Sequence, residues 1–200
     1  MYPAAGDLLA SLQQSTNVGL RHLPGSGGTL YSRLADHPGI EQTFHDGLQT
    51  FSKAAFDGLI RCDVLTASKH VLDIGGGDGS NALALSRAHD HLNVTIVDLP
   101  SVLRIAEKNI AKAHPSDRIR LHAVDFPAEP LPEGADTILF AHVLPIFPPR
   151  INEQLLAKAH QALPSGGRVL IFNTMQDDTQ DGPAMAMLFS AHGLCVATKP

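Results

Sequence analysis

The segment VLDIGGGDGS, residues 71–80, is the part of the sequence whose residue types point most directly to chemistry. It holds four glycines within five positions, directly after an apolar run. A glycine-rich turn between a strand and a helix lets a ligand approach the backbone closely and presents N–H groups at the helix N-terminus. The pattern DxGxGxG is complete, because it is filled by Asp73, Gly75, Gly77 and Gly79. This turn predicts a site for a nucleotide-like cofactor.

Three classes of ligand suit such a loop, and the neighbouring residues separate them. A phosphate-binding P-loop is excluded because no Lys follows in the GxxxxGK[ST] pattern. The dinucleotide fingerprint GxGxxG is matched by Gly75 and Gly77, but Ser80 stands at its third glycine. The third ligand is S-adenosylmethionine (SAM), which carries a cationic sulfonium and an ammonium group. The carboxylates of Asp73 and Asp78 suit a cation and would repel a pyrophosphate, so SAM is favoured over NAD.

Acidic residues also end the next two apolar strands along the chain. Asp98, followed by Leu99, ends the second strand, where a carboxylate can accept hydrogen bonds from both ribose hydroxyls of NAD or SAM. Asp125 and Phe126 follow the third strand, where Asp can accept from an adenine amine and Phe can pack on its ring. A single Asp at a strand end is usually a turn or capping residue, but acidic residues at successive strand ends favour a cofactor site. The predicted cofactor-binding residues are Asp73, Gly75, Gly77, Asp78, Asp98, Leu99, Asp125 and Phe126.

Short β-rich runs and helical patterns alternate after residue 69, and they supply the frame for these residues. Continuous apolar strands separated by helices are typical of a parallel sheet covered on both faces. Ligands of such sheets bind at the carboxyl ends of the strands, where the strand order reverses. The sequence therefore predicts an α/β, Rossmann-like fold with the glycine loop at the ligand-binding edge. The predicted strands are 70–74, 93–98, 119–124, 136–141 and 168–173, and the predicted helices are 79–89, 101–113 and 150–162.

The chain before residue 69 has a different character. Helical patterns cover roughly 4–20 and 40–64, and a glycine-rich loop at 23–28 joins them. We expect residues 1–68 to form a helical N-terminal segment that contains a linker and dimer or lid helices. We expect residues 69–200 to form the SAM-binding catalytic domain.

Composition limits the class of protein. The chain has 200 residues, enough for one domain with a full core, and a formal net charge of −5. It has no basic block, so neither nucleic acid nor a membrane surface is an expected partner. No apolar run approaches the length of a membrane helix, and the N-terminus does not read as a signal peptide. Cys62 and Cys195 make no paired metal or redox motif, and the triplet His89-Asp90-His91 is interpreted as a solvated turn. A cytoplasmic protein without a metal site is expected.

Several stretches together carry a resemblance to a known family. They are HVLDIGGGDGS at 70–80, TIVDLPSV at 95–102, VDF at 124–126 and ALPSGGRVLIFN at 162–173. In combination they resemble the SAM-dependent small-molecule methyltransferases of the caffeate and hydroxyindole O-methyltransferase type. The resemblance implies methyl transfer from SAM to a phenol or similar small aromatic metabolite, and it implies a homodimer. FAHVLPIF at 140–147 looks closer to a C-methylating subgroup of antibiotic pathways, the tyrosine or aryl-pyruvate methyltransferases.

The position of the catalytic base departs from that family. Its O-methyltransferases read roughly V-L-H-D-W after the fourth strand, and the His is the general base. This chain has Pro145 at the His position and Ile146 at the Asp position, so the usual base is absent. His142 is the expected substitute, because a neutral imidazole can deprotonate a phenol at physiological pH. A packed or capping histidine is the equal alternative, and both O- and C-methylation stay open.

The resemblance also concerns the extent of the chain. The family has a winged-helix domain before this region, and a further helix and two strands after it. The resemblance therefore implies a chain that is truncated at both ends, with an open sheet edge and an incomplete acceptor pocket. Two alternatives to an active methyltransferase stay open, an NAD-linked oxidoreductase and an inactive fragment that keeps the SAM-binding fold.

Overall fold

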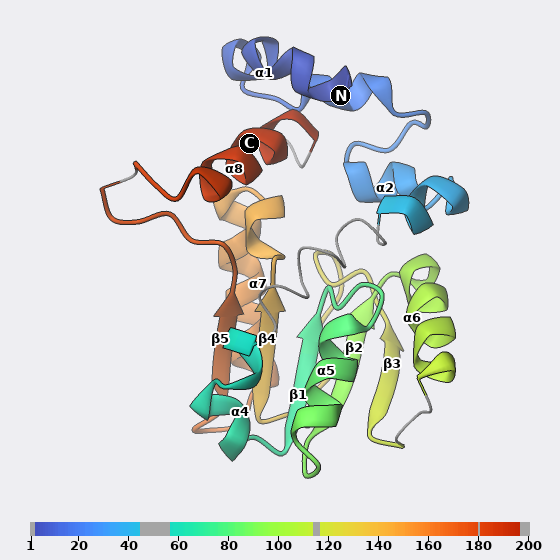
Figure 1. Ribbon diagram of the computed structural model, residues 1–200, viewed down its shortest axis with the longest axis vertical. Helices are drawn as coiled ribbons and strands as arrows, with labels where there is room; N and C mark the ends of the chain where they lie inside the picture. Colours follow the sequence, from blue (N-terminus) through green and yellow to red (C-terminus); the bar gives the residue numbers. More distant parts are fainter. Residues whose placement is uncertain (1–2, 45–56, 114–116, 180, 197–200) are drawn as a thin grey trace. The chain divides into compact units, whose positions relative to one another are not determined.

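A computed structural model of the chain describes residues 3–44, 57–113, 117–179 and 181–196 (Figure 1). The chain forms two compact units. The sheet unit consists of 39–141 and 153–172, and the helical unit consists of 1–38, 142–152 and 173–200. The predicted division into 1–68 and 69–200 concerns the organisation of the whole protein and stays a prediction.

A five-stranded sheet forms the centre of the sheet unit, and every neighbouring pair of its strands is parallel. The strand order is β3-β2-β1-β4-β5, so it reverses between β1 and β4, as Figure 1 shows. The strands are β1 (His70–Ile74), β2 (Asn93–Asp98), β3 (Ile119–Ala123), β4 (Thr137–Ala141) and β5 (Arg168–Phe172). Each predicted strand is present within one residue of its predicted ends, and the predicted α/β, Rossmann-like fold is confirmed.

Helices connect the strands as predicted. They are α5 (Ser80–Ala88) between β1 and β2, α6 (Pro100–Lys112) between β2 and β3, and α7 (Pro149–Ala162) between β4 and β5. Pro100 stands at the start of α6, where its fixed φ suits a helix and its missing N–H leaves no donor unpaired. α6 buries Val102, Ala106 and Ile110 at four-residue spacing, and these side chains make one apolar face.

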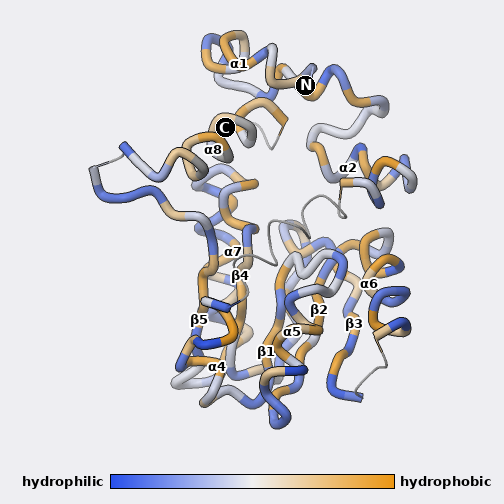
Figure 2. Tube along the Cα trace, in the orientation of Figure 1, coloured by the Kyte–Doolittle hydropathy of each residue, from blue (hydrophilic) through white to orange (hydrophobic). Residues whose placement is uncertain are grey.

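The core of the sheet unit lies on the central strands. Val71 on β1, Ile96 on β2 and Leu139 on β4 have no exposed surface. Figure 2 shows hydrophobic stretches along these strands. The outer strands differ, because Leu121 on β3 and Ile171 on β5 are 38% and 41% exposed. β3 and β5 are therefore the edges of the described sheet.

The prediction of a helical pattern over 40–64 is confirmed for most of its described residues, but it is wrong at 61–62, where the helix is interrupted. Residues 38–44 and 57–60 are helical, the chain turns at 61–62, and α4 (Asp63–Ala67) follows. Cys62 is extended, and its N–H donates to the Leu59 carbonyl at 3.1 Å. The turn lets both Leu59 and Leu65 enter the core, where they are 2% and 0% exposed. Residues 45–56 of this pattern lie outside the described residues.

The helical unit holds the other short helices. They are η1 (Pro3–Asp7), α1 (Leu8–Gln14), η2 (Val18–His22), α2 (Leu30–Leu34), η3 (Leu144–Ile146) and α8 (Ala184–Val196). α8 lies against η1, α1 and η2. The predicted helix over 4–20 is divided in the structure into η1, α1 and η2. α1 ends at Ser15 because this residue adopts a left-handed conformation.

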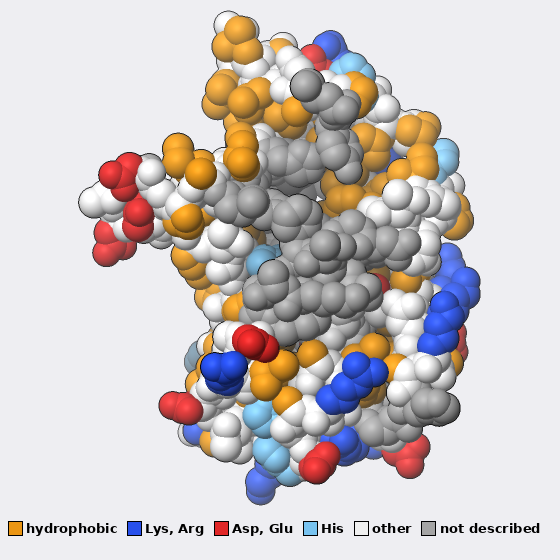
Figure 3. All heavy atoms as spheres, in the orientation of Figure 1, with side chains coloured by type: hydrophobic (Ala, Val, Ile, Leu, Met, Phe, Trp, Pro, Cys, Tyr) orange, Lys and Arg blue, Asp and Glu red, His pale blue; other side chains and the backbone are white. Residues whose placement is uncertain are grey.

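The charges on the surface are mixed. On the face drawn in Figure 3, Lys and Arg side chains occur together with acidic, apolar and uncharged ones. Within the described part of the chain, no helix combines the length and the apolar character that crossing a membrane requires.

Candidate functional site

The glycine loop leaves the sheet at the carboxyl end of β1. The Gly75 N–H donates to the Val97 carbonyl on β2 at 2.8 Å, which continues the strand pairing. The Gly79 N–H then donates to the Gly76 carbonyl at 3.1 Å, and α5 begins at the next residue. Gly75, Gly77 and Gly79 have φ angles of 65°, 59° and 82°, in the left-handed region that favours glycine. The backbone path therefore requires the glycines of the DxGxGxG pattern.

Gly76 is required for a different reason, which the pattern does not contain. A Cβ atom at Gly76 would lie 2.7 Å from Oδ2 of Asp73 and 2.9 Å from Cγ2 of Ile96. Both neighbours are buried, so neither can move away easily. The motif treats this position as variable, and the sequence analysis missed it for that reason.

Asp73 lies in β1, opposite Ile96 on β2 and Leu139 on β4. Its side chain has no exposed surface, and neither carboxylate oxygen makes a well-formed hydrogen bond with the described residues, although the Asn81 side chain lies near enough to favour the charged form. Burial, followed by the charges of Asp98 and Asp78, raises the pKa of Asp73 to about 7, although the Asn81 side chain lowers it. Because a buried carboxylate without a donor is costly, this position favours a ligand that brings a donor or a positive charge.

Asp98 joins the end of β2 to the glycine loop. Its Oδ2 accepts from the Gly77 N–H at 2.9 Å, and its Oδ1 accepts from the Leu99 N–H at 2.7 Å. Burial raises the pKa of Asp98, the two N–H donors lower it, and the charge of Glu41 raises it; the net value is about 6. Asp98 therefore fixes the loop, whichever cofactor group it meets.

Glu41 is a part of the site that the sequence analysis missed. It lies in the helical stretch 38–44, is 4% exposed, and its charge acts on Asp98. A third buried carboxylate therefore adds to the negative charge around the loop. No local motif surrounds Glu41 in the sequence, so its effect on Asp98 can be recognised only in the folded structure.

Asp78 caps α5. Its Oδ1 accepts from the Ser80 N–H at 3.0 Å and its Oδ2 from the Ser80 hydroxyl at 2.9 Å. The Asn109 side chain on α6 also donates to the Asp78 carbonyl at 3.1 Å, which ties the loop to that helix. Asp78 contributes charge to the site through its effect on Asp73, and its direct contact with a cofactor stays a prediction.

Asp125 and Phe126 follow β3, beside the end of β2. The Val124 N–H donates to the Asp98 carbonyl at 3.0 Å, which brings this turn next to the loop. The Asp125 side chain is exposed and Phe126 is buried. The Lys158 ammonium donates to the Phe126 carbonyl at 3.0 Å and to two further carbonyls of the turn. The structure therefore brings together all the predicted cofactor residues at the carboxyl ends of three neighbouring strands, while their contacts with a cofactor stay predictions.

His142 belongs to the helical unit and directly follows β4 in the chain. It is half-buried, and its φ of 59° lies in the left-handed region. Its Nδ1 lies 2.9 Å from Oδ1 of Asn173. Pro145, at the position of the family's usual base, is an exposed residue of η3. His142 as the base stays a prediction, and Asn173 is a neighbour that the sequence analysis did not consider.

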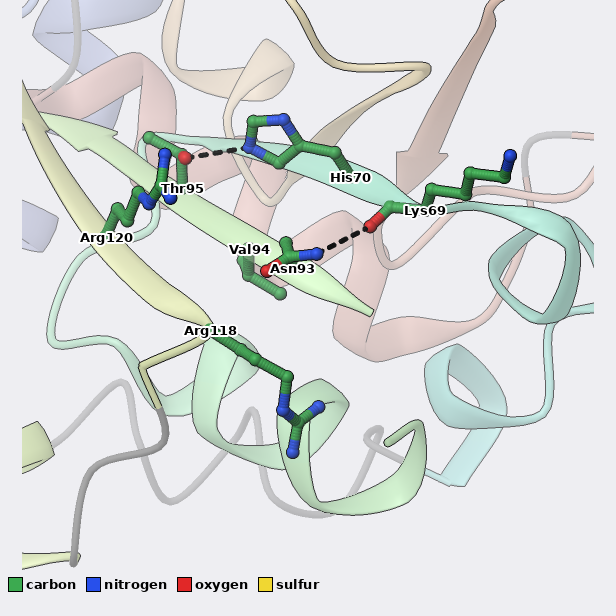
Figure 4. A pocket seen from close by; sticks show the side chains of 7 residues that line it. All are labelled: Lys69, His70, Asn93, Val94, Thr95, Arg118 and Arg120. Atoms are coloured by element: carbon green, nitrogen blue, oxygen red, sulfur yellow. Dashed lines mark hydrogen bonds between the residues drawn. The ribbon is translucent and has the colours of Figure 1, made fainter. Parts of the chain in front are cut away.

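A cavity of about 240 Å³ lies at the opposite ends of the strands (Figure 4). Two of its basic residues, His70 and Arg118, bind neighbouring protein groups. His70 Nε2 contacts the Thr95 hydroxyl at 2.9 Å and its Nδ1 contacts the Gly134 carbonyl at 3.1 Å. The Arg118 guanidinium donates to carbonyls at the end of α5, and Figure 4 shows it pointing away from His70. These contacts are structural and do not converge on a ligand. The other residues lining the cavity are Lys69, Asn93, Val94 and Arg120.

The sequence matches the O-methyltransferase domain family over residues 7–198. It is 42% identical over 191 residues to the L-tyrosine C(3)-methyltransferase of Streptomyces lavendulae, covering 96% of this chain and 52% of that protein. It is 36% identical over 193 residues to the 3-hydroxy-5-methyl-1-naphthoate 3-O-methyltransferase of Streptomyces sahachiroi, covering 96% and 55%. The chain spans about half the length of these curated relatives.

Solved structures agree with these sequence relationships. The apo form of the S-adenosylmethionine-dependent methyltransferase SibL is 42% identical with a TM-score of 0.79, covering 99% of this chain and 58% of that one. Human N-acetylserotonin methyltransferase in complex with SAM has a TM-score of 0.88 at 23% identity, covering 99% and 56%, and it shows the shared fold. With the parallel sheet, the glycine loop and a family match over most of its length, this chain belongs to the O-methyltransferase domain family.

Proposed function

We propose that this chain binds SAM at the glycine loop and transfers its methyl group to a small aromatic metabolite. The observation that carries the proposal is the buried carboxylate of Asp73, which makes no well-formed hydrogen bond with the described residues of a methyltransferase-family chain and has only the nearby Asn81 side chain to favour its charge. A cationic cofactor offsets the cost of that buried group. The pyrophosphate of NAD would add to the negative charge instead, so charge and family membership both favour SAM over an NAD-linked oxidoreductase.

The residues of the loop fit such a cofactor. Asp73 and Asp98 offer carboxylates to its positive groups and ribose hydroxyls, and a nearby cation would lower the raised pKa of both. The glycine backbone leaves room for a close approach. When bound, SAM supplies an activated methyl group on a sulfonium centre. The remaining proposed contacts come from Asp78, Leu99, Asp125 and Phe126.

His142 is proposed to act as the general base toward a phenolic acceptor. A neutral imidazole takes the proton of the phenol hydroxyl, and the resulting phenolate has negative charge on its oxygen and on its ortho carbon. Either atom can then be the nucleophile; when it is the carbon, the hydrogen on that carbon must leave as a proton after the methyl group is transferred, which restores the aromatic ring. Besides this proton transfer, the chain mainly holds the nucleophile at attack distance and excludes water.

The acceptor class follows from the chemistry that the relatives share. One relative is named for the C(3) position of L-tyrosine and another for the 3-hydroxyl of a naphthoate. Both names denote molecules that contain a hydroxylated aromatic ring and a carboxylate. We therefore propose a phenolic aromatic acid as the acceptor, in a pathway of secondary metabolism such as antibiotic biosynthesis.

Two expectations about the whole protein belong to the same proposal. The family resemblance supports a homodimer. Cys62 and Cys195 are both unpaired thiols, in keeping with a reducing, cytoplasmic location.

Single-turnover transfer of a labelled methyl group from SAM tests the proposal. The chain is mixed with labelled SAM and, in separate reactions, tyrosine, hydroxyphenylpyruvate and hydroxynaphthoates. Label in an aromatic product is expected, and its position on carbon or oxygen identifies the nucleophile. SAM binding without any transfer would favour the inactive-fragment alternative, and NAD binding without SAM binding would overturn the cofactor assignment.

A further inference from the structure

His142 and Asn173 occupy equivalent places on neighbouring strands. β4 and β5 are parallel, and their last paired residues are Ala141 and Phe172. His142 directly follows β4, Asn173 directly follows β5, and both residues belong to the helical unit. The strand register therefore explains why two residues far apart in the sequence have Nδ1 and Oδ1 atoms 2.9 Å apart.

The orientation of the Asn173 amide is determined by its other neighbour. The backbone N–H of Thr174 donates to Oδ1 of Asn173 at 2.9 Å. A backbone N–H can only donate, so the atom that it meets has to be the amide oxygen and not the amide nitrogen. The same oxygen faces Nδ1 of His142.

The orientation of the amide sets the tautomer of the imidazole. An amide oxygen only accepts, so Nδ1 of His142 carries the hydrogen of this bond. In the neutral ring the proton-accepting nitrogen is then Nε2. We propose that Asn173 is a positioning residue that holds His142 as the Nδ1–H tautomer and makes Nε2 the basic nitrogen toward the acceptor. The proposal rests on the role of His142 in the proposed function.

The backbone supports this interpretation. Among the described residues other than glycine, only His142 and Ser15 have positive φ angles. Ser15 ends a helix, where this conformation is common, whereas His142 follows a strand. A non-glycine residue in this region is strained, and such strain is concentrated at functional sites. The strained backbone here places the imidazole against Asn173.

The use of an amide and not a carboxylate also has a chemical consequence. In catalytic triads a third residue accepts from the base imidazole and holds its orientation, and Asn fills this place in some of them. A neutral amide orients the ring without adding a negative charge that would favour the imidazolium.

Histidine tautomers can be read directly by NMR. Long-range correlations between ring protons and ¹⁵N nuclei identify the protonated nitrogen, and comparison with His142→Gln assigns the His142 signals. We expect Nδ1 protonated and Nε2 unprotonated in the chain at pH 8. Asn173→Ala should shift His142 toward the Nε2–H tautomer, which an unconstrained imidazole prefers. An Nε2–H tautomer in the unaltered chain would overturn the proposal, whatever its activity.

Kinetics supply the second readout. Asn173→Ala should lower the rate of single-turnover methyl transfer about 10- to 100-fold, with unchanged SAM affinity. This loss is no larger than the smallest loss expected when the base itself is removed, about 10²-fold. Asn173→Asp keeps both hydrogen bonds but adds a negative charge, so activity should persist and its acidic limb should move to higher pH. Asn93→Ala, far from His142 in the sequence and in the other unit, should leave rate and pH profile unchanged.

The outcomes separate the two proposals. A pH profile that is the same in Asn173→Asp as in the unaltered chain would show that Asn173 has only a packing role. If the unaltered chain transfers no methyl group, the proposed function fails, while the NMR tautomer still decides whether Asn173 orients His142.

Discussion

The glycine loop after β1 and the segment after β4 follow neighbouring strands of one sheet, yet they carry function in different ways. In the loop, the glycines allow the backbone to turn from β1 into α5, and the predicted chemistry depends on a local pattern of glycines and acidic residues. The segment after β4 depends on one side chain, His142, and on a partner 31 residues further along the chain. The sequence of the loop alone therefore favours SAM over NAD, whereas the segment after β4 needs a structure before its chemistry can be argued.

The largest expected effect lies in the segment after β4. His142→Ala should lower methyl transfer roughly 10²- to 10⁴-fold, the span usual for the loss of a general base, without changing SAM affinity. His160→Ala is the matched control, because this exposed histidine lies on α7. Equal rates for the two variants would mean that His142 has a packing role, and the comparison between the two regions would fail.

Asp98→Asn tests the loop. The amide keeps one acceptor oxygen but loses the charge, and either the Gly77 or the Leu99 N–H loses its acceptor. SAM affinity, measured by titration calorimetry, should fall about 10- to 100-fold, because hydrogen bonds to charged groups are worth roughly 1.5–3 kcal/mol. Asp117→Asn, at an exposed position, is the control. A folded Asp98→Asn variant with unchanged affinity would contradict the ribose assignment.

Gly76→Ala separates close packing from conformational freedom in the loop. The added Cβ would meet Oδ2 of Asp73 at 2.7 Å, so the variant should lose about 1–3 kcal/mol of unfolding free energy in urea. Gly58→Ala has open space around it in a helical stretch and should gain roughly 0.5–1 kcal/mol. Equal effects of the two substitutions would show that the loop tolerates a side chain at residue 76.

The smallest effect is the pH dependence of the loop. The pKa values of Asp73 and Asp98 are about 7 and about 6, both above the ordinary Asp value of 3.8. The folded chain therefore binds more protons than the unfolded chain between these values. The cofactor-free protein should lose stability as the pH rises from about 4 to 7. A cationic cofactor favours the charged carboxylates, so SAM affinity should increase about tenfold between pH 6 and pH 8, with release of protons. Calorimetry in buffers of different ionisation enthalpy measures this release. Affinity that is constant over this range, or equally steep in Asp73→Asn, would contradict the assignment.

Much of the fold was accessible from the sequence because its determinants are local. Apolar runs of strand length alternate with helical patterns, and all five strands follow from them. The N-terminal helices were less accessible. The turn at Cys62 and the end of α1 at Ser15 depend on which side chains reach the core, and periodicity does not record that.

The site divides in the same way. Asp73, Asp98 and the glycines stand in a recognisable pattern, and the structure brings them together. Gly76, Glu41 and Asn173 matter through neighbours that lie elsewhere in the sequence or at variable positions of a motif. Such residues carry no local signal, because only the folded chain defines what their side chains meet.

Titration calorimetry of the unaltered chain with SAM and, separately, with NAD tests the central claim most directly. The carboxylates of Asp73 and Asp98 and the completed glycine pattern predict saturable binding of SAM and none of NAD at the same concentrations. Saturable binding of NAD with no binding of SAM would contradict the account.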